Sequence, residues 1–410
     1  MNRVQSISTT QALIVSTFFA GFGGGVVFPI LPTLGIVLGI SPFLVELILS
    51  ANRFTCIVAN APAGALTDRL GTRRLLIVGL FIEGIATLGY VAALRFSPAS
   101  AWFLGARIVW GLGSALVFAT VYTIASDVSE SGSRGTNMGI VRGGMTFGFP
   151  AGLVVGGIVS ELASIPVAFG LAATLALMAS VLAYITVPET HVGVQQTRIK
   201  PWEIDTRPSV LTVGFVNFGV FFAYFGVLFA TLVLFLDAHG IGIAGLDARG
   251  TSGVLMAVTV LSGSVWMFGG GKGSDMLEHR IPILVVFLGV FLVGFLVLAG
   301  VSGLPGVLAA CVLIGAGYGG TSGPMLALLA DLTPDDRMGR AMGTNNVFGD
   351  LGGGIGPLIS LPLIQVVGFP ALYAVCAAVP LLAGAILLGS IYLQTGTTRY
   401  RFGRPYRNFV

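Results

Sequence analysis

The chain has 410 residues, of which 55% are hydrophobic and only 9% are charged. A soluble globular protein carries about 25% charged residues, so this composition excludes a soluble multidomain enzyme and a disordered chain. Glycine is abundant, at 60 residues, but lacks the three-residue period of collagen. The apolar stretches are long and continuous, unlike the alternating segments of a membrane β-barrel. The composition therefore predicts an all-α membrane protein with many spans.

Charge-free runs of sequence locate the spans. No Asp, Glu, Lys or Arg occurs in residues 4–45, 208–236, 281–330 or 351–398. A span needs about 20 apolar residues, so each of the last two runs holds two helices, divided near 302–305 and near 368–370. The first apolar run is too long for a cleaved signal peptide and is read as helix 1. Twelve transmembrane helices are predicted, over about residues 11–33, 42–66, 74–95, 99–126, 136–160, 166–187, 210–236, 249–271, 281–300, 305–329, 340–365 and 370–393.

The basic residues gather on one side of this predicted topology. With the N-terminus inside, sixteen of the 21 Lys and Arg residues are cytoplasmic, and only Arg95 and Arg249 are outside. The positive-inside rule then places both termini in the cytoplasm of a protein of the cell membrane. The basic pI of about 9.1 reflects this topology, and no nucleic-acid partner is expected.

A long polar stretch between the sixth and seventh helices divides the chain into two halves. We expect an N-terminal six-helix bundle over 1–187, a cytoplasmic linker over 188–209 and a C-terminal six-helix bundle over 210–394. Residues 395–410 form a basic, aromatic cytoplasmic tail, which is typical of contact with anionic lipid head groups.

The two halves are related by an internal repeat. A shift of 204 residues places Gly148 on Gly352 and Gly152 on Gly356, without gaps from helix 4 to the start of helix 6. Near the second helix, a shift of 207 places Arg73 on Arg280. Two parallel six-helix repeats, related by an axis along the membrane normal, are the plan of one large class of transporters.

The loop after helix 2 carries a motif. The segment from Gly64 to Arg74 is similar to the signature GxLxDRxGRR of the major facilitator superfamily, although Thr72 replaces one basic residue. A degenerate copy runs from Gly271 to Arg280. The residues that match the motif are Gly64, Asp68, Arg69, Gly71, Arg73 and Arg74.

Two further motifs extend the resemblance. The segment from Arg107 to Gly113 in helix 4 is similar to the RxxxGxG motif of proton-coupled members. In helix 5, the run from Gly144 to Gly157 resembles the antiporter motif GxxxGPxxGG, apart from an inserted Phe149, and includes Gly148, Pro150 and Gly152. The resemblance covers the whole chain, implies the twelve-helix fold of two pseudo-symmetric bundles, and is nearest to the drug/proton antiporter branch.

The resemblance implies a role for the loop motif. Asp68 would contact the N-terminus of helix 11 near Arg340 and form an inside gate, because a helix N-terminus favours negative charge. A static loop of solvated charges is the alternative. Gly64 and Gly71 would allow tight turns and close helix approach, and the glycines of helix 5 would allow close packing and bending, or packing alone.

Ionisable residues inside the spans are expensive and mark candidate functional positions. At 1.5 Å per residue, Asp350 lies about 15 Å beyond Arg340. The implied fold brings helices 2 and 11 together, so Arg53 would face Asp350, and protonation of Asp350 would release Arg53 and couple protons to transport. A static pair is the alternative. Arg107 would act in proton coupling by its motif, and Glu83 would act there or pair with an arginine of helix 2 or 4.

A substrate cavity is predicted between the halves. Arg142 would attract an anionic group of the substrate, or its side chain would extend toward the cytoplasmic surface of the membrane. Several other polar side chains would bind substrate or bridge helices: Asn217, Tyr224, Tyr318, Asn345 and Asn346. Helix 7 contains six phenylalanines, which suit a cavity for hydrophobic solutes. Six positions on one helix cannot all face one side, so some of these phenylalanines face the lipid.

The leading hypothesis is a secondary active transporter that works by alternating access and exports small hydrophobic or amphipathic compounds in exchange for protons. The alternative is proton-coupled uptake or exchange of an organic anion. The sequence contains no HExxH or GxSxG motif, and its three cysteines lack metal-ligand spacing, so no enzyme activity, cofactor or metal is expected. The expected partners are the substrate, protons and membrane lipids, and the expected state is a monomer.

Overall fold

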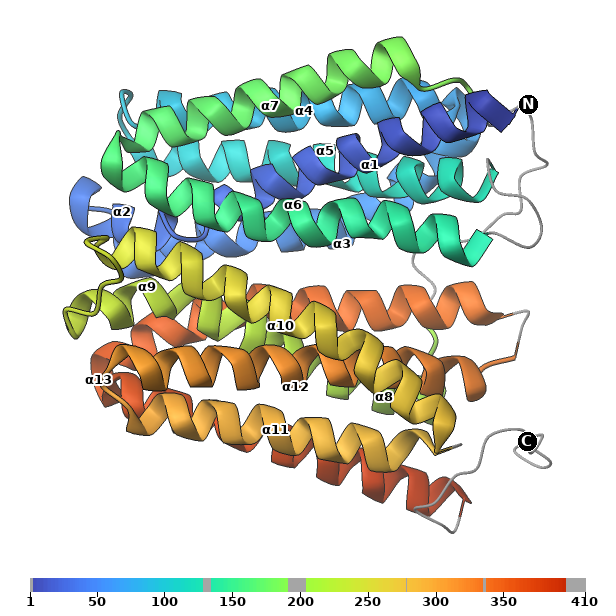
Figure 1. Cartoon of the computed structure of the whole chain (residues 1–410), viewed down its shortest axis with the longest axis vertical. Coiled ribbons are helices and arrows are strands. Elements are labelled where there is room, and N and C mark those ends of the chain that lie inside the picture. The colour runs from blue at the N-terminus through green and yellow to red at the C-terminus, as the bar shows by residue number, and fades with distance from the viewer. Residues whose placement is uncertain (1–2, 128–133, 191–203, 278, 335–336, 396–410) are drawn as a thin grey trace. The chain divides into compact units, whose positions relative to one another are not determined.

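The computed structural model describes residues 3–127, 134–190, 204–277, 279–334 and 337–395. Within these ranges the protein is helical, apart from connecting segments and one isolated β-bridge between Ile243 and Leu246 (Figure 1). The all-α fold class predicted from the sequence is confirmed. The elements are α1 (Arg3–Val26), α2 (Leu31–Leu38), α3 (Pro42–Leu70), α4 (Thr72–Ala93), α5 (Ala99–Asp127), α6 (Arg134–Leu162), α7 (Ile165–Thr186), α8 (Pro208–Phe221), η1 (Phe222–Leu228), α9 (Phe229–Ala238), α10 (Ala248–Met276), α11 (Arg280–Gly300), α12 (Leu304–Asp331) and α13 (Met338–Thr395).

The predicted number of spans agrees with these helices. Eleven helical segments of the described residues are long and apolar enough to cross a membrane. The last of them contains two predicted helices, because Gly368 interrupts α13 with non-helical angles (φ 75°, ψ 173°). Pro370 follows and cannot donate a backbone N–H to a continuing helix. The sequence places a boundary at this same point.

Two predicted helices differ from the observed ones. Helix 1 ends at Val26, and α2 begins at Leu31 after a turn that contains Pro29. Proline lacks an N–H and crowds the preceding helical turn, which accounts for the break. Helix 7 is also not uniform, because a π-helical stretch, η1, separates α8 from α9. A continuous apolar run carries no sign of such an insertion.

The chain divides into two compact units. Unit 1 comprises Met1–Trp202 and Leu232–Ala257, and unit 2 comprises Glu203–Thr231 and Val258–Val410. Unit 1 therefore includes most of α9 and the start of α10, although both follow the linker in sequence. The predicted bundles over 1–187 and 210–394 follow the repeat instead, and stay a prediction.

Repeat-related glycines make equivalent contacts in the two units. In unit 1, a Cβ atom at Gly148 or Gly152 would overlap the backbone carbonyl of Phe18 or Phe22, so α6 lies directly against α1. In unit 2, a Cβ atom at Gly352 would overlap the carbonyl of Phe218, and Gly356 meets Gly226 in the same way, so α13 lies against α8 and η1. The four glycines therefore serve close helix packing. Pro150 lies within α6 between the two glycines of unit 1.

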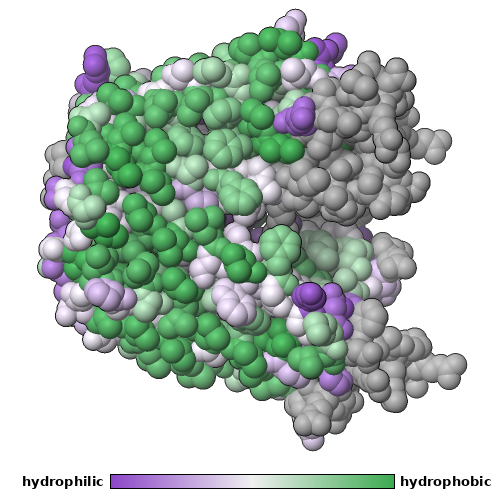
Figure 2. Space-filling view, in the orientation of Figure 1, coloured by the Kyte–Doolittle hydropathy of each residue, from purple (hydrophilic) through white to green (hydrophobic). Residues whose placement is uncertain are grey.

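The described surface is strongly apolar. Figure 2 shows hydrophobic residues over most of the described part of the face in view. Several large side chains are among the most exposed, including Leu393 at 85%, Val366 at 82% and Phe268 at 75%. Monomeric soluble proteins rarely expose apolar patches of this extent, whereas a lipid bilayer covers them.

Candidate functional site

Four aromatic rings gather in unit 2 around the π-helical stretch. Tyr224 of η1 stacks on Tyr318 of α12, with ring centroids 4.0 Å apart and ring planes 4° apart. The rings of Phe221 and Phe225 each lie 5.7 Å from that of Tyr318. Tyr224 is buried, whereas the other three are half-buried. Phe221 at the end of α8 and Tyr224 and Phe225 of η1 thus all contact the ring of Tyr318 on α12.

Two buried amides adjoin these rings. Asn217 of α8 donates a hydrogen bond from Nδ2 to the backbone carbonyl of Asn345 of α13, at 2.8 Å. A Cβ atom at Gly349 would lie 2.8 Å from Asn217 Nδ2 and 3.5 Å from the Phe221 ring, so the amides and the rings are neighbours. We call this group the aromatic–amide cluster. It comprises Asn217, Phe221, Tyr224, Phe225, Tyr318 and Asn345.

One atom of the cluster has unused hydrogen-bonding capacity. Asn345 is 2% exposed, and among the described residues its Oδ1 atom accepts no hydrogen bond. A buried acceptor without a partner costs about 1–3 kcal/mol, so this atom has the capacity to accept a hydrogen bond. The neighbouring Asn346 is exposed. Of the six residues predicted to line the cavity, four thus lie together: Asn217, Tyr224, Tyr318 and Asn345.

The two residues of the predicted charge pair lie in different units. Asp350 follows Gly349 on α13 in unit 2, and Arg53 lies on α3 in unit 1. Both are half-buried. Their pairing stays a prediction. The side chain of Arg142 on α6, like that of Asp68 on α3, lies outside the described residues.

Arg107 is buried in unit 1 and binds the backbone of α3. Its Nε atom donates to the carbonyl of Ile48 at 3.2 Å, and its Nη2 atom donates to Leu49 O at 3.2 Å and to Asn52 Oδ1 at 2.7 Å. The guanidinium also lies 5.7 Å from the ring centroid of Trp110. All three acceptors are neutral, so these contacts use three N–H donors of Arg107 without neutralising its charge.

Glu83 of α4 is 2% exposed and packs against α5. A Cβ atom at Gly113 would lie 3.0 Å from Glu83 Cγ. Among the described residues Glu83 forms no ion pair, and its Oε2 atom accepts no hydrogen bond. The expected arginine partner is therefore missing, because Arg107 is engaged by α3 instead.

The loop motif is anchored within unit 1. The Glu189 carboxylate accepts hydrogen bonds from the backbone N–H of Thr72 at 2.8 Å and from its hydroxyl at 2.9 Å, so it caps the start of α4. Arg73 donates from Nη2 to the Tyr184 carbonyl at 2.6 Å and lies over the Tyr184 ring. The structure thus gives Thr72, the departure from the motif, a partner that sequence reasoning missed.

The remaining motif residues are simpler. Arg69 and Arg74 are exposed. Gly71 has a φ angle of 87°, a conformation that favours glycine. Among the described residues, a Cβ atom at Gly64 would meet nothing within 4 Å, so close helix approach at Gly64 stays a prediction.

A family model described as Major Facilitator Superfamily matches residues 13–357. The chain belongs to the major facilitator superfamily. It is therefore a multi-pass membrane transporter and not an enzyme, as the sequence resemblance predicted.

Relatives and solved structures agree with this membership. The chain is 24% identical over 381 residues to an uncharacterized MFS-type transporter of Methanocaldococcus jannaschii, covering 91% of this chain and 95% of that one. It is 24% identical over 377 residues to Multidrug resistance protein 2 of Bacillus subtilis, covering 89% and 92%. A bacterial homolog of the human lysosomal transporter Spinster shares its fold, with a TM-score of 0.79, 13% identity and coverage of 98% and 100%.

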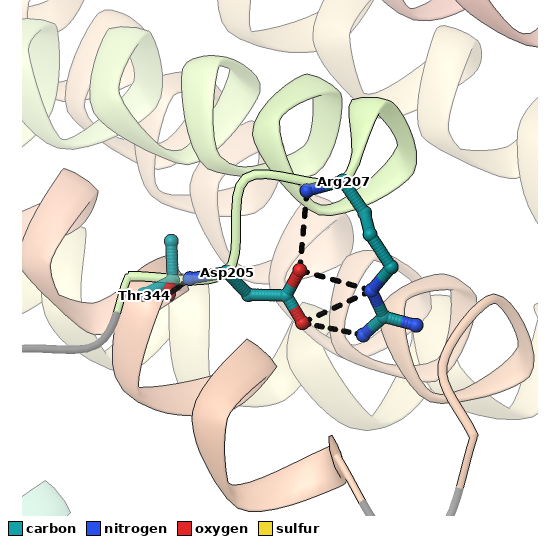
Figure 3. Close-up of polar contacts among 3 residues, drawn as sticks. All are labelled: Asp205, Arg207 and Thr344. Carbon is teal, nitrogen blue, oxygen red and sulfur yellow. Dashed lines mark hydrogen bonds and ion pairs between the residues drawn. The ribbon is translucent and has the colours of Figure 1, made fainter. Parts of the chain in front are cut away.

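In this superfamily member, the end of the linker is fixed to the start of α13. Figure 3 shows that the backbone N–H of Asp205 donates to Thr344 Oγ1, at 2.8 Å. The Asp205 carboxylate accepts hydrogen bonds from Nε and Nη2 of Arg207, at 2.9 and 2.5 Å. These bonds hold the pKa of Asp205 below its ordinary value, although partial burial opposes them. Thr344 precedes Asn345, so the linker ends beside the aromatic–amide cluster.

Proposed function

We propose that this facilitator-superfamily protein works by alternating access and exports small hydrophobic or amphipathic compounds across the cell membrane, in exchange for protons. The observation that carries the substrate class is the aromatic–amide cluster. Its half-buried rings offer apolar faces, and a positively charged solute gains further from cation–π attraction. The Oδ1 atom of Asn345 would accept a hydrogen bond from the polar end of such a compound.

The names of two relatives support this substrate class. Multidrug resistance protein 2 of Bacillus subtilis matches nearly the whole chain, and the quinolone resistance protein NorA of Staphylococcus aureus matches about half of it at 24% identity. Both names describe resistance to drugs. At this identity they favour a substrate class without fixing a substrate.

Proton coupling rests on the charges inside the spans. Asp350 is adjacent in sequence to Gly349, whose backbone touches the cluster. We propose that Asp350 takes up the proton and releases Arg53, with both termini cytoplasmic and Asp68, Arg69 and Arg73 at the inside gate. Arg107 and Glu83 are the secondary candidates, because both are buried among the spans of unit 1.

The test uses the purified chain in proteoliposomes that contain a pH-sensitive probe, with a lipophilic cationic dye as substrate. Exchange predicts that dye moving in one direction drives protons in the other. Tyr318→Ala should raise the KM for the dye by up to about tenfold, since an aromatic pair contributes roughly 0.5–1.5 kcal/mol. Tyr392→Ala, at a residue of α13 that is 57% exposed, is the matched control and should leave the KM unchanged.

A separate variant tests the proposed role of Asp350 in proton coupling. Asp350→Asn should abolish dye-driven proton movement while the dye still binds. Unchanged proton movement in this variant would contradict the coupling role of Asp350, and proton movement in the same direction as the dye would contradict exchange.

A second candidate function is uptake or exchange of an organic anion. The neutral acceptors around Arg107 favour it, because they leave a positive charge inside unit 1. A fluorescent carboxylate in place of the cationic dye separates the two functions.

A further inference from the structure

Helix α10 begins without a cap from its own side chains. Its first helical residue is Ala248, so Asp247 is the N-cap residue, and its carbonyl accepts the first intrahelical bond from Thr251 N–H at 3.0 Å. An aspartate at this position normally accepts a hydrogen bond from the N–H two or three residues later. Here the Asp247 side chain is exposed, and among the described residues its carboxylate accepts none.

A carboxylate from another helix takes that place. Glu161, near the end of α6, accepts a hydrogen bond from Asp247 N–H at Oε1, at 2.6 Å, and from Gly250 N–H at Oε2, at 2.8 Å. These are the two N–H groups that a capping box satisfies, where a Glu at the third helical position normally helps. Position 250 is a glycine instead, and a Cβ atom there would lie 3.1 Å from Glu161 Oε2.

The surrounding contact is made of backbone. A Cβ atom at Gly157 would lie 2.6 Å from the Arg249 carbonyl, and one at Gly253 would overlap the Leu153 carbonyl. Because the backbones of α6 and α10 lie so close here, there is no room for large side chains between them. The two hydrogen bonds of Glu161 are therefore the specific polar interactions that join the two helices. All these residues belong to unit 1 and lie at its end remote from the start of α1 (Figure 1).

We propose that α10 exchanges caps as the transporter opens at this end: Glu161 caps it when α6 and α10 touch, and Asp247 caps it when they separate. This inference rests on the alternating access proposed above, since α6 and α10 come from different repeats. The exchange keeps the N–H of Gly250 bonded in both arrangements. It lowers the cost of separation, because the helix end is never left without an acceptor.

The two carboxylates therefore act in opposite directions. Glu161 stabilises the closed contact with two hydrogen bonds to a charged group, and Asp247 stabilises the separated arrangement with an ordinary N-cap. Removing the Glu161 carboxylate should shift the equilibrium toward the separated arrangement, and removing the Asp247 carboxylate should shift it toward the closed contact. A merely structural pair would not show opposite signs.

The test measures the populations of the two arrangements by pulsed electron–electron resonance on the purified full chain. Spin labels are attached to Leu162→Cys, at a residue that is 72% exposed, and to Ala238→Cys at the end of α9, in a chain without its native cysteines. Glu161→Gln should raise the ratio of long to short distances by about tenfold. Adding Asp247→Ala to that variant should lower the ratio by about fivefold.

Two further variants complete the design. Glu161→Asp is too short to reach both N–H groups and should shift the ratio in the same direction as Glu161→Gln, which covers the case in which Glu161→Gln fails to fold. Asp237→Asn removes an exposed carboxylate of α9 that caps no helix among the described residues and is the matched control, with no expected change in the ratio.

An unchanged ratio in both Glu161 variants, or a rise with Asp247→Ala, would overturn the cap exchange. These distances are measured without substrate or gradient. Failure of transport in liposomes with the predicted distance changes would therefore reject the proposed function and leave the exchange of caps standing.

Discussion

The loops that begin α4 and α11 occupy equivalent positions in the two repeats, and different chemistry holds them. In unit 1, Glu189 caps the backbone of Thr72, and Arg73 binds the carbonyl and the ring of Tyr184. In unit 2, Arg280 stands at the position of Arg73 and binds carboxylates. Its Nε atom lies 3.1 Å from Asp331 Oδ2, and its Nη1 atom binds Asp275.

The contacts of Arg73 and Arg280 show which features the two repeats share and which they do not. The helix–loop–helix frame and the arginine occur in both copies, whereas the partners of the arginine among the described residues differ. The side chains of Asp68 and Asp127, which the repeat places on Asp275 and Asp331, lie outside the described residues. In the second copy the arginine ties α11 to α10 and α12 by ion pairs, and Ser274 Oγ accepts another bond from Nη1 at 2.8 Å. In the first copy, neutral groups from the end of α7 hold the arginine, and the carboxylate serves the backbone of α4.

The largest expected effect comes from removing the arginine of unit 2. Arg280→Ala leaves two acidic groups without their cation, and the side chains of Arg280 and Asp331 are only 10% and 14% exposed. Breaking a largely buried pair in this way costs about 3 kcal/mol. Arg73→Ala removes neutral contacts and should cost about 1 kcal/mol. Thermal unfolding of both variants in detergent measures the difference, and equal losses would contradict this comparison.

A smaller effect concerns another ion pair of unit 2, at the end of the linker. Hydrogen bonds from Arg207 lower the pKa of Asp205. The pair should therefore stabilise the protein fully above the ordinary aspartate pKa of about 4 and lose its effect as the pH falls through the lowered value. Since Arg207 is 25% exposed, we expect a contribution on the order of 1 kcal/mol.

Comparing the wild-type chain with Asp205→Asn isolates this contribution. The wild-type chain should be the more stable at pH 7, and the two should converge as the pH falls below about 4. Thermal unfolding at a series of pH values provides the measurement. A difference that persists unchanged in acid would exclude the Asp205 carboxylate as its source.

The sequence predicted the frame of this molecule well. Charge-free runs located the spans, the Gly368–Pro370 segment located the break in α13, and the repeat paired glycines that make equivalent packing contacts. These features depend on local composition and on backbone sterics, both of which a single sequence records.

Contacts between distant segments escaped prediction. Asn217 and Asn345 were both candidates, but their hydrogen bond depends on how α8 meets α13. Glu161 and Glu189 each cap a helix more than 80 residues away in sequence, and no periodicity marks such an acid. The η1 stretch was missed because a continuous apolar run has the same sequence pattern whether it forms an α-helix or a π-helix.

The smallest expected effect tests whether two glycines at equivalent positions of the repeat both lack close neighbours. Gly64 and Gly271 occupy equivalent positions near the ends of α3 and α10, and a Cβ atom at either would meet nothing within 4 Å. Alanine should therefore stabilise each helix by roughly 0.5–1 kcal/mol, because glycine loses more backbone freedom on folding. Gly71→Ala should destabilise instead, since its φ angle is 87° and Glu189 lies against it. If Gly64→Ala lowers the melting temperature while Gly271→Ala raises it, the first loop meets a partner that the second lacks, as a gate at Gly64 requires.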